Sequence, residues 1–579
     1  MTAHPGGANL VGVVNVRRNL LWLLVALALP AVVYAATLAT PLHVMDDHEI
    51  YYLAGMTRAT APRNIVEYTR QDFHENGRFR PLFGLERLGL ARAVGPNATL
   101  LRLLPYAAVL ATTAILFFWG ASLGFGPWCS TVAAWLVVLN PTGSESWVLL
   151  AAQERMGVLW IALAMLAIVR WAATSRRAWQ LTWVLAAVMA ALTKESFVLV
   201  LPGLMLAAVF ADMLLAGHSF RRALVRNAWA AAAVAAVGVA VGIIAAVAVV
   251  RNADTYGSYL VSRGRIFHGI VGVIRQAAYS DVLLIPLALF GAAYIHQRWG
   301  KPGREDWRKG GREDQNLVPI PSSLPPVLTS SLPPLKSPLV WPPRAAGLLA
   351  LAVAVWVVPI WGLQAKIGIA GKRWIFPMAI ALAAANGLAF WRVRRAAGRA
   401  FRLAMDIGIA VWFAYSATAC VERVWFFRAD ALLYQDILAA VDRATGRGGR
   451  VLAIPASGMQ AEPEVSLRFF LDGMGRSDIA IDRLEIPPDP RQGPYPAALE
   501  SLWSRYLTEV SSPDMAKYDA ILPLPFRGVL KGLDVQQAAQ YGEVLRYRRS
   551  YFHLRLTGMP VDQIVAEIHV RSSPSPQDR

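Results

Sequence analysis

Residues 20–38 read LLWLLVALALPAVVYAATL, an apolar run that contains no charged side chain. In helical form, a run of this length reaches across the hydrocarbon core of a bilayer. Further long apolar runs recur along the first three quarters of the chain, and 56% of its 579 residues are hydrophobic. A soluble domain of this size does not tolerate so many such runs. The chain is therefore predicted to be a polytopic α-helical membrane protein.

The apolar runs predict about eleven transmembrane helices, each close to the length that the hydrocarbon core requires. The predicted spans are residues 20–38, 100–124, 128–141, 147–170, 179–193, 196–216, 227–250, 268–296, 345–363, 373–391 and 403–422. Two of them, 128–141 and 179–193, are short for a full crossing. Such segments tilt, kink or end at membrane depth beside a polar cavity.

Basic residues in the short connections predict the orientation, because Lys and Arg are retained on the cytoplasmic side. They gather in alternate connections, at Arg17, Arg18, Arg176, Arg177, Arg221, Arg222, Arg226, Arg392, Arg394, Arg395, Arg399 and Arg402. We therefore expect residues 1–19 in the cytoplasm, a transmembrane domain at 20–424 with an outer loop at 39–99, and residues 425–579 outside. The same pattern accounts for most of the net charge of +19 without nucleic acid as a partner.

Two segments differ in composition from the apolar runs. Residues 297–343 begin with mixed charge and continue as a Pro, Ser and Leu stretch, which predicts an extended cytoplasmic linker. Residues 425–579 alternate helical and strand-like patterns, which predicts a C-terminal extracytoplasmic α/β domain. The predicted helices of this domain are 432–443 and 465–471, and its predicted strands are 451–454, 520–522, 541–547 and 551–556.

Acidic residues crowd the outer end of the first predicted span, where Asp46, Asp47 and Glu49 follow its last residue closely. Carboxylates this close together beside a bilayer repel one another and lose hydration. They therefore stay in water and do little, hold a metal ion, or take up a proton. The last two possibilities make the group a candidate site.

The outer loop continues with a basic part and an amphipathic part. Arg78 and Arg80 precede residues 82–93, whose leucines are expected to face lipid while Glu86 and Arg87 face water, as in an interfacial helix. Guanidinium groups beside such a helix are well placed to bind the phosphate of a membrane-borne substrate. A solvated turn is the alternative interpretation for both arginines.

Ionisable residues also stand at the ends of predicted spans or within them. They are Glu154, Arg155, Lys194, Glu195, Lys372 and Arg373. Because ionisable groups at membrane depth are costly, each is a functional candidate, with pairing between neighbouring helices or contact with lipid headgroups as the alternative. Lys194 and Glu195 are adjacent and point in different directions on a helix, so they are not expected to pair with each other.

The order of these features resembles the membrane-embedded GT-C class of glycosyltransferases. The resemblance covers roughly residues 15–425 and rests on the acidic pair, the long outer loop with its Arg-Pro element, and the motifs LTKES (192–196) and GKRWIFP (371–377). It is closest to bacterial members and to protein O-mannosyltransferase and aminoarabinose-transferase relatives. It implies transfer of a hexosyl or pentosyl group from a polyprenyl-phosphate-linked donor to a glycan, lipid or protein acceptor, at the outer face of the bacterial inner (plasma) membrane.

The class motif, carried over to this sequence, places the catalytic carboxylate at Asp46 or Asp47. A direct displacement needs a base that takes the proton of the acceptor hydroxyl, and the leaving phosphate needs cations where its charge develops. We prefer Asp46, although the sequence does not separate it from its neighbour. The pattern D-D-H-E departs from the more familiar D-E and leaves the roles of His48 and Glu49 open. The candidates for binding the substrate and its phosphate are Arg78, Arg80, Lys194, Lys372, Arg373 and Glu154.

No metal cofactor is expected, because adjacent carboxylates chelate one ion poorly without a third ligand, and a divalent cation is the alternative. Cys129 and Cys420, the only cysteines, lie in apolar runs and offer no zinc site. Two other functions stay open. One is a transporter or flippase for lipid-linked sugars, although no internal repeat supports it. The other is an O-antigen ligase or polymerase that acts on pyrophosphate-linked oligosaccharides.

Overall fold

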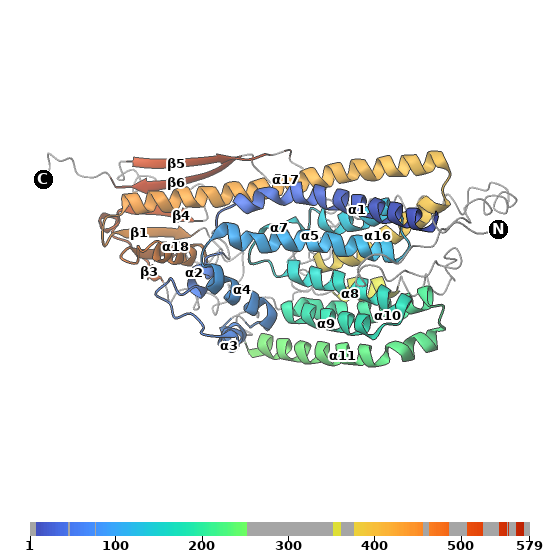
Figure 1. Ribbon diagram of the computed structural model, residues 1–579. Coiled ribbons are helices and arrows are strands. Elements are labelled where there is room, and N and C mark those ends of the chain that lie inside the picture. The colour runs from blue at the N-terminus through green and yellow to red at the C-terminus, as the bar shows by residue number, and fades with distance from the viewer. Residues whose placement is uncertain are drawn as a thin grey trace, which may run out of the picture.

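The computed structural model describes residues 7–43, 47–75, 77–251, 351–359, 376–455, 462–485, 507–524, 543–552, 554 and 563–571. The predicted span at 268–296 and the predicted linker at 297–343 lie outside these residues. Figure 1 shows long helices that run side by side, with a β-sheet beyond one end of the bundle. We call this the sheet end of the bundle, and the opposite one the far end.

The long helices coincide with the apolar runs. The bundle contains α1 (Gly7–Tyr34), α5 (Ala98–Ser122), α6 (Pro127–Val138), α8 (Glu154–Thr174), α9 (Arg177–Thr193), α10 (Leu201–Leu215), α11 (Phe220–Arg251), α16 (Phe376–Ala396) and α17 (Arg399–Ala444). The short 3-10 helices η1 (Ala35–Ala39) and η2 (Glu195–Val200) extend α1 and precede α10. Within the described residues, 6 helical stretches are long and apolar enough to cross a membrane. They are Asn19–Ala39, Ala98–Ser122, Glu154–Thr174, Glu195–Leu215, Phe220–Ala248 and Arg399–Ala444.

Local signals in the sequence account for several helix ends. The side chain of Asn97 caps α5 and accepts a hydrogen bond from the backbone N of Leu100 at 3.1 Å. Pro81 and Pro127 begin α4 (Pro81–Val94) and α6, at positions where a backbone donor is not needed. These three helices therefore begin where the sequence offers a cap or a proline.

The chain is broken between α6 and α8. With 12 residues, α6 is about 18 Å long, shorter than the roughly 30 Å of a hydrocarbon core. It is followed by the short helix α7 (Ser144–Val148), and α8 begins only at Glu154. The prediction of one continuous helix over 147–170 is therefore wrong in its first part.

Two arginines explain how the protein tolerates this break. The backbone O of Val148 accepts a hydrogen bond from Nη1 of Arg102 at 2.6 Å, and the O of Leu149 accepts one from Nη1 of Arg155 at 2.7 Å. Backbone groups shielded from water must find partners inside the protein. Side chains from α5 and α8 supply the partners that a continuous helix would have provided.

The longest helix joins the bundle to the sheet. α17 has 46 residues and is therefore about 69 Å long. Figure 1 shows it reaching from the far end of the bundle to the sheet. The predicted domain division at residue 425 falls inside α17, and the predicted helix at 432–443 is its last part. The two regions thus share one uninterrupted element.

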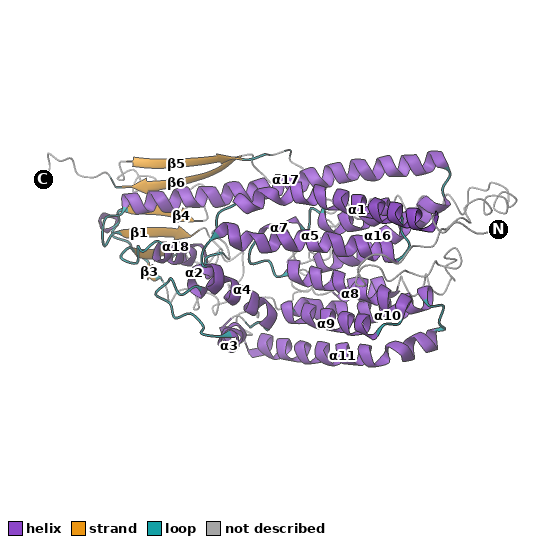
Figure 2. Ribbon diagram, in the orientation of Figure 1, coloured by secondary structure: helices purple, strands orange, loops and turns teal. Residues whose placement is uncertain are grey.

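The C-terminal region contains a six-stranded sheet, as Figure 2 shows at one end of the molecule. The strands are β1 (Arg450–Pro455), β2 (Ala480–Leu484), β3 (Thr508–Val510), β4 (Ala520–Leu524), β5 (Glu543–Ser550) and β6 (Gln563–Val570). Their order is β3-β2-β1-β4-β6-β5. The first four are parallel, and β6 runs antiparallel to both of its neighbours. Helix α18 (Glu462–Gly473) connects β1 to β2.

Most of the predicted strands and the second predicted helix are confirmed, but the strand at 551–556 is wrong in its described residues. After Ser550 the chain leaves the sheet and contacts α17. The ring of Tyr551 lies 5.2 Å from that of Phe426, and the backbone N of Leu554 donates to Oε1 of Glu422 at 3.1 Å. The strand that pairs with β5 is β6, further along the chain.

Three short helices lie at the sheet end of the bundle: α2 (Glu49–Leu53), α3 (Ile65–Glu75) and α4 (Figure 1). A single hydrophobic core includes Ile50 of α2, Leu88 of α4, Leu433 of α17, Phe470 of α18 and Ile481 of β2. The sheet region is therefore packed onto the sheet end of the bundle, with α2 and α4 inside the contact.

Candidate functional site

The acidic loop, which we define as residues 43–49, follows η1 and leads into α2. Asp46, the preferred base, lies outside the described residues. Asp47 is fully buried. Its Oδ2 accepts a hydrogen bond from the backbone N of His43 at 2.8 Å and pairs with Nη2 of Arg102 at 3.2 Å. Its Oδ1 has no hydrogen-bond partner in the described part of the chain. Asp47 therefore anchors the acidic loop to α5 through Arg102.

Arg102 is the partner that holds Asp47 to α5. Besides the carboxylate and the O of Val148, it donates to the backbone O of Thr40 and of Pro41, each at 2.8 Å. Its side chain is 1% exposed, and a buried guanidinium is tolerated only when it is paired and hydrogen-bonded. Arg102 was not predicted as a functional residue, although an arginine inside a predicted span is itself a signal.

His43 anchors the other side of the loop to α17. Its Nε2 lies 2.7 Å from Oδ2 of Asp430. Burial alone would lower the pKa of His43, but the hydrogen bond and charge of Asp430, with the charge of Asp47, outweigh burial and raise it. Both described sides of residues 44–46 are therefore fixed to long helices, one to α5 and one to α17. Asp430 was not predicted as a functional residue.

A layer of paired charges lies beside the acidic loop. We call it the charged layer and define it by five ion pairs from α2, α3, α4, α8, η2, Lys194 between α9 and η2, and the segment before α4. The pairs are Glu49 with Arg87 at 2.9 Å, Asp72 with Arg80 at 2.6 Å, Glu86 with Arg155 at 2.6 Å, Glu154 with Lys194 at 2.5 Å, and Glu195 with Arg78 at 3.4 Å. Half of these side chains are buried, namely Asp72, Arg87, Glu154, Arg155 and Lys194, and around them solvent screens the charges only weakly.

Four of the predicted substrate-binding residues meet in this layer. Glu154 pairs with Lys194, whose neighbour Glu195 pairs with Arg78, so acids and cations from α8, η2 and the outer loop alternate. Lys194 and Glu195 were not expected to pair with each other, and the ion pairs described here join Lys194 to Glu154 and Glu195 to Arg78. Arg78 is the most accessible of these cations, with a side chain that is 23% exposed.

Arg80 also belongs to the charged layer, but its guanidinium is already bound. Nε and Nη2 donate to the two carboxylate oxygens of Asp72 at 2.9 and 2.6 Å. Burial alone would lower the pKa of Arg80, but the charge and hydrogen bonds of Asp72 raise it well above its usual range. Arg80 thereby fixes the segment before α4 to α3. Asp72 was not predicted as its partner, because nothing in the local sequence pairs them.

The predicted faces of α4 need a correction. The helix is present, and Leu85 is exposed as expected, but Leu88 is 5% exposed and Arg87 is 2% exposed. Arg87 was expected to face water, and instead its Nη2 donates to Glu49 of α2 at 2.9 Å. The charged side of α4 is therefore turned towards the acidic loop, because acids from other elements lie there.

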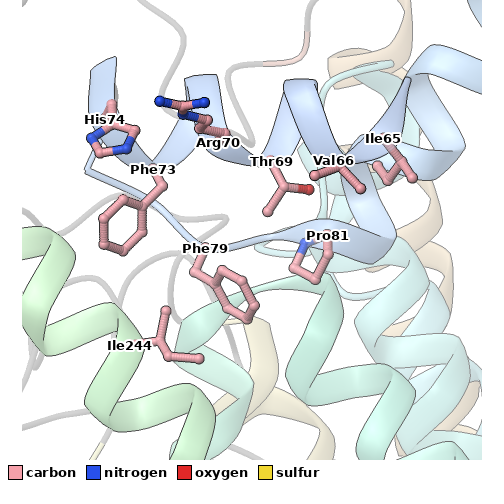
Figure 3. A pocket seen from close by; sticks show the side chains of 9 residues that line it. All are labelled: Ile65, Val66, Thr69, Arg70, Phe73, His74, Phe79, Pro81 and Ile244. Atoms are coloured by element: carbon pink, nitrogen blue, oxygen red, sulfur yellow. The ribbon is translucent and has the colours of Figure 1, made fainter. Parts of the chain in front are cut away.

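An apolar groove of about 450 Å³ lies between α3 and α11. Its lining residues are Ile65, Val66, Thr69, Arg70, Phe73, His74, Phe79, Pro81 and Ile244. In Figure 3, Phe73, Phe79 and Ile244 face one another, and Arg70 and His74 lie at one end. Nearby on α11, Val239 and Ile243 are 61% and 59% exposed. The groove therefore adjoins an apolar helix surface.

The segment 78–80 connects the groove to the charged layer. Phe79 lines the groove, while Arg78 and Arg80 bind Glu195 and Asp72. Successive side chains of this segment thus serve two environments, one apolar and one ionic. An elongated molecule with an apolar part and an anionic part matches both.

Two predicted phosphate-binding residues, Lys372 and Arg373, lie outside the described residues. Within those residues, no group of three His, Cys, Asp or Glu side chains is placed to hold a metal ion. Cys129 and Cys420 are both buried and free.

No protein-family model matches this chain, and a comparison with curated proteins also finds no match. The described residues form a mostly helical protein with several candidate membrane spans and a small C-terminal sheet.

Proposed function

We propose that this protein is a membrane-embedded glycosyltransferase of the GT-C type, which moves a sugar from a polyprenyl-phosphate donor to an acceptor hydroxyl. The observation that carries the proposal is the segment 78–80, where Phe79 lines the apolar groove and Arg78 and Arg80 enter the charged layer. A polyprenyl phosphate has the same two parts, an apolar chain and a charged head that arginine binds well.

The proposal places the sheet end of an eleven-span protein outside the cytoplasm, in a bacterial inner membrane. Figure 1 shows the connections from α10 to α11 and from α16 to α17 at the far end. The helices that begin there carry Arg221, Arg222, Arg399 and Arg402 in their first residues. Clustered arginines mark the cytoplasmic side of a membrane protein, so the far end is the cytoplasmic end in this proposal.

The reaction that we propose is a direct displacement at the anomeric carbon. The acceptor oxygen forms a bond to this carbon as the bond from the carbon to the phosphate oxygen breaks. The proton of the acceptor hydroxyl passes to a carboxylate, and the polyprenyl phosphate leaves with the electron pair of the broken bond. A base contributes about 10²–10⁴-fold to such a step, and cations at the leaving phosphate lower the barrier further.

The residues divide these roles between them. Asp46 is the proposed base. Asp47 is its anchor, because its carboxylate is buried against Arg102. Arg78 is the proposed contact to the donor phosphate, since it is the more exposed of the two loop arginines and its bond to Glu195 is long, at 3.4 Å. Lys194 lies one residue from that acid and adds positive charge.

The test is a transfer assay with the full-length protein in lipid nanodiscs. Radiolabelled polyprenyl-phosphate hexoses and pentoses are supplied as donors, and the release of polyprenyl phosphate is measured with and without an extract of envelope glycans as acceptor. We expect acceptor-dependent release with at least one donor. Binding of the labelled lipid without any cleavage of the sugar would contradict the proposal. Movement of that uncleaved lipid across the membrane of sealed proteoliposomes would then identify a lipid-linked sugar transporter instead.

A further inference from the structure

The C-terminal region follows α17 back towards the bundle. From β5 onward, its residues contact successive turns of α17 in reverse order. The contacts are Tyr547 with Arg443 at 3.5 Å, Arg549 with Asp436 at 2.6 Å, Tyr551 with Phe426 at 5.2 Å between ring centroids, and Leu554 with Glu422 at 3.1 Å. The last contact falls at the end of the apolar run 403–422. The C-terminal region therefore reaches the candidate membrane span of α17.

Exposed apolar side chains gather where this contact is made. Phe552 and Leu554 are 45% and 52% exposed, and Trp425, one turn beyond Glu422 on α17, is 39% exposed. Trp425 is aligned with the exposed Ile407, which lies about five helical turns earlier on the same face. In a membrane-spanning helix an exposed apolar face contacts lipid, and tryptophan is enriched where that face meets the bilayer surface.

Arg428, about one turn beyond Trp425, has no acid to balance its charge. Its guanidinium carbon lies 5.0 Å from the centroid of the Trp425 ring. Within the described residues no carboxylate pairs with Arg428, and its buried Nε has no hydrogen-bond acceptor. The nearest acids along α17 bind other groups, Glu422 the backbone N of Leu554 and Asp430 the ring of His43. A guanidinium that stacks through its face keeps N–H groups at its edge, and this edge matches a phosphate.

The position of Arg428 along α17 corresponds to the depth of lipid headgroups. The helix is uninterrupted from Arg399 to Ala444, so Arg428 lies about 39 Å along its axis from Arg402. A bilayer is about 30 Å thick across its hydrocarbon core and about 40–45 Å thick with both headgroup layers. With Arg402 in one headgroup layer, Arg428 therefore lies in the opposite one.

We infer that Trp425 and Arg428 bind the headgroup of an anionic phospholipid of the bilayer, with Phe552 and Leu554 in the apolar layer beside it. Arg428 donates to the phosphate of the lipid, and a headgroup without a cation of its own leaves this attraction undiminished. The bound lipid holds the sheet region at the bilayer surface. The inference goes beyond the proposed sugar transfer and does not depend on it.

The first test is a titration of the full-length protein in detergent with phosphatidylglycerol, followed by native mass spectrometry. We expect Arg428→Gln to bind this lipid about tenfold more weakly than the wild type. Arg447→Gln, at an exposed arginine beyond the end of α17, is the control and should bind it as the wild type does. Inorganic phosphate should not compete, because it lacks the apolar part.

Two results of this titration would overturn the inference. One is equal binding of phosphatidylglycerol by all three proteins. The other is a loss of polyprenyl phosphate binding in Arg428→Gln with unchanged binding of phosphatidylglycerol, which would assign Arg428 to the proposed donor site. If the wild-type protein cleaves no polyprenyl-phosphate sugar but the titration gives the expected result, the lipid site stands and the proposed function fails.

A second test locates the apolar part of the site. Phe552→p-benzoylphenylalanine introduces a photo-cross-linker there, and the same replacement at Val544 is the control. Val544 is 43% exposed on β5, and it lies about 20 Å further from the span of α17 than the end of the strand at Ser550. After illumination in nanodiscs, we expect phospholipid adducts at position 552 and none at position 544. Adducts at neither position, or equally at both, would contradict the inference.

Discussion

The ring of His43 is hydrogen-bonded to the carboxylate of Asp430, 387 residues further along the chain, with Nε2 and Oδ2 2.7 Å apart. The backbone N of the same histidine donates to Asp47, which in turn pairs with Arg102. His43 therefore ties the acidic loop to α17, and Asp47 ties the loop to α5. Residues 44–46, which include the proposed base, lie between these two anchors.

The first prediction concerns the stability of the bond between His43 and Asp430. Because the folded pKa of His43 is raised above the unfolded value of about 6.5, the bond stabilises fully below about pH 6.5. This stabilisation is lost as the pH rises through the folded value. Asp430→Asn should therefore lower the free energy of unfolding by about 1–3 kcal/mol at pH 6 and by less at pH 9.

Thermal unfolding of the purified protein at the two pH values measures this difference. Asp514→Asn is the control, because Asp514 is an exposed acid in the sheet region, with a side chain that is 57% exposed. A loss of stability in Asp430→Asn that is equal at pH 6 and pH 9 would show that the histidine charge plays no part.

The second prediction concerns the buried pair of Asp47 and Arg102. Arg102→Met leaves Asp47 without its cation and removes the donors for three backbone carbonyls. We expect a loss of about 3–5 kcal/mol in the free energy of unfolding. The double variant Asp47→Asn with Arg102→Met should be less destabilised than the sum of the single variants, with a coupling of about 1–3 kcal/mol.

A double-mutant cycle by thermal unfolding measures this coupling, and Arg447→Met is the control at an exposed arginine of the sheet region. Additive effects of the two substitutions would contradict the anchoring role of Asp47.

The third prediction separates the two arginines of the segment 78–80. Arg80→Gln and Asp72→Asn should both lower the melting temperature, because each leaves a buried charge without its bidentate partner. Arg78→Gln should leave the melting temperature nearly unchanged and raise KM for the donor by about tenfold, a loss of about 1.4 kcal/mol. If Arg78→Gln alters stability but leaves KM as in the wild type, Arg78 is structural and does not bind phosphate.

The fourth prediction concerns the apolar groove. Ile244→Trp should fill it and raise KM about tenfold for a long-chain polyprenyl donor, with a smaller effect on a short-chain analogue that does not reach the groove. The control is Leu185→Trp on α9, where the side chain is 62% exposed on another apolar helix. An equal effect of Ile244→Trp on long and short donors would show that the groove does not bind the polyprenyl chain of the donor.

The sequence predicts the elements that depend on local composition. Long apolar runs give the helices of the bundle, and short strand-like apolar runs give β1 and β4. The interruption between α7 and α8 was not predicted, because residues 147–153 are as apolar as a helix. Arg102 and Arg155 help to satisfy the open backbone there. The strand expected at 551–556 was displaced by contacts with Phe426 and Glu422 on α17, which lie far away in the sequence.

In the candidate site, too, the sequence predicts what depends on composition but not the contacts between distant residues. The predicted residues Arg78, Arg80, Lys194 and Glu154 meet in one layer, because ionisable groups at the ends of spans gather where they can pair. Asp72, the partner of Arg80, and Asp430, the partner of His43, were not foreseen, since pairing across the fold depends on how helices pack rather than on neighbours in the chain. Arg102 could have been found as the lone arginine of an apolar span.

The most direct test of the account is the rate of sugar transfer by Asp46→Asn, measured beside Asp514→Asn as an exposed-acid control. Loss of the base should lower kcat by about 10²–10⁴-fold, while the melting temperature and the affinity for polyprenyl phosphate stay near those of the wild type. A variant that folds, binds the lipid and transfers sugar at the wild-type rate would contradict the central claim.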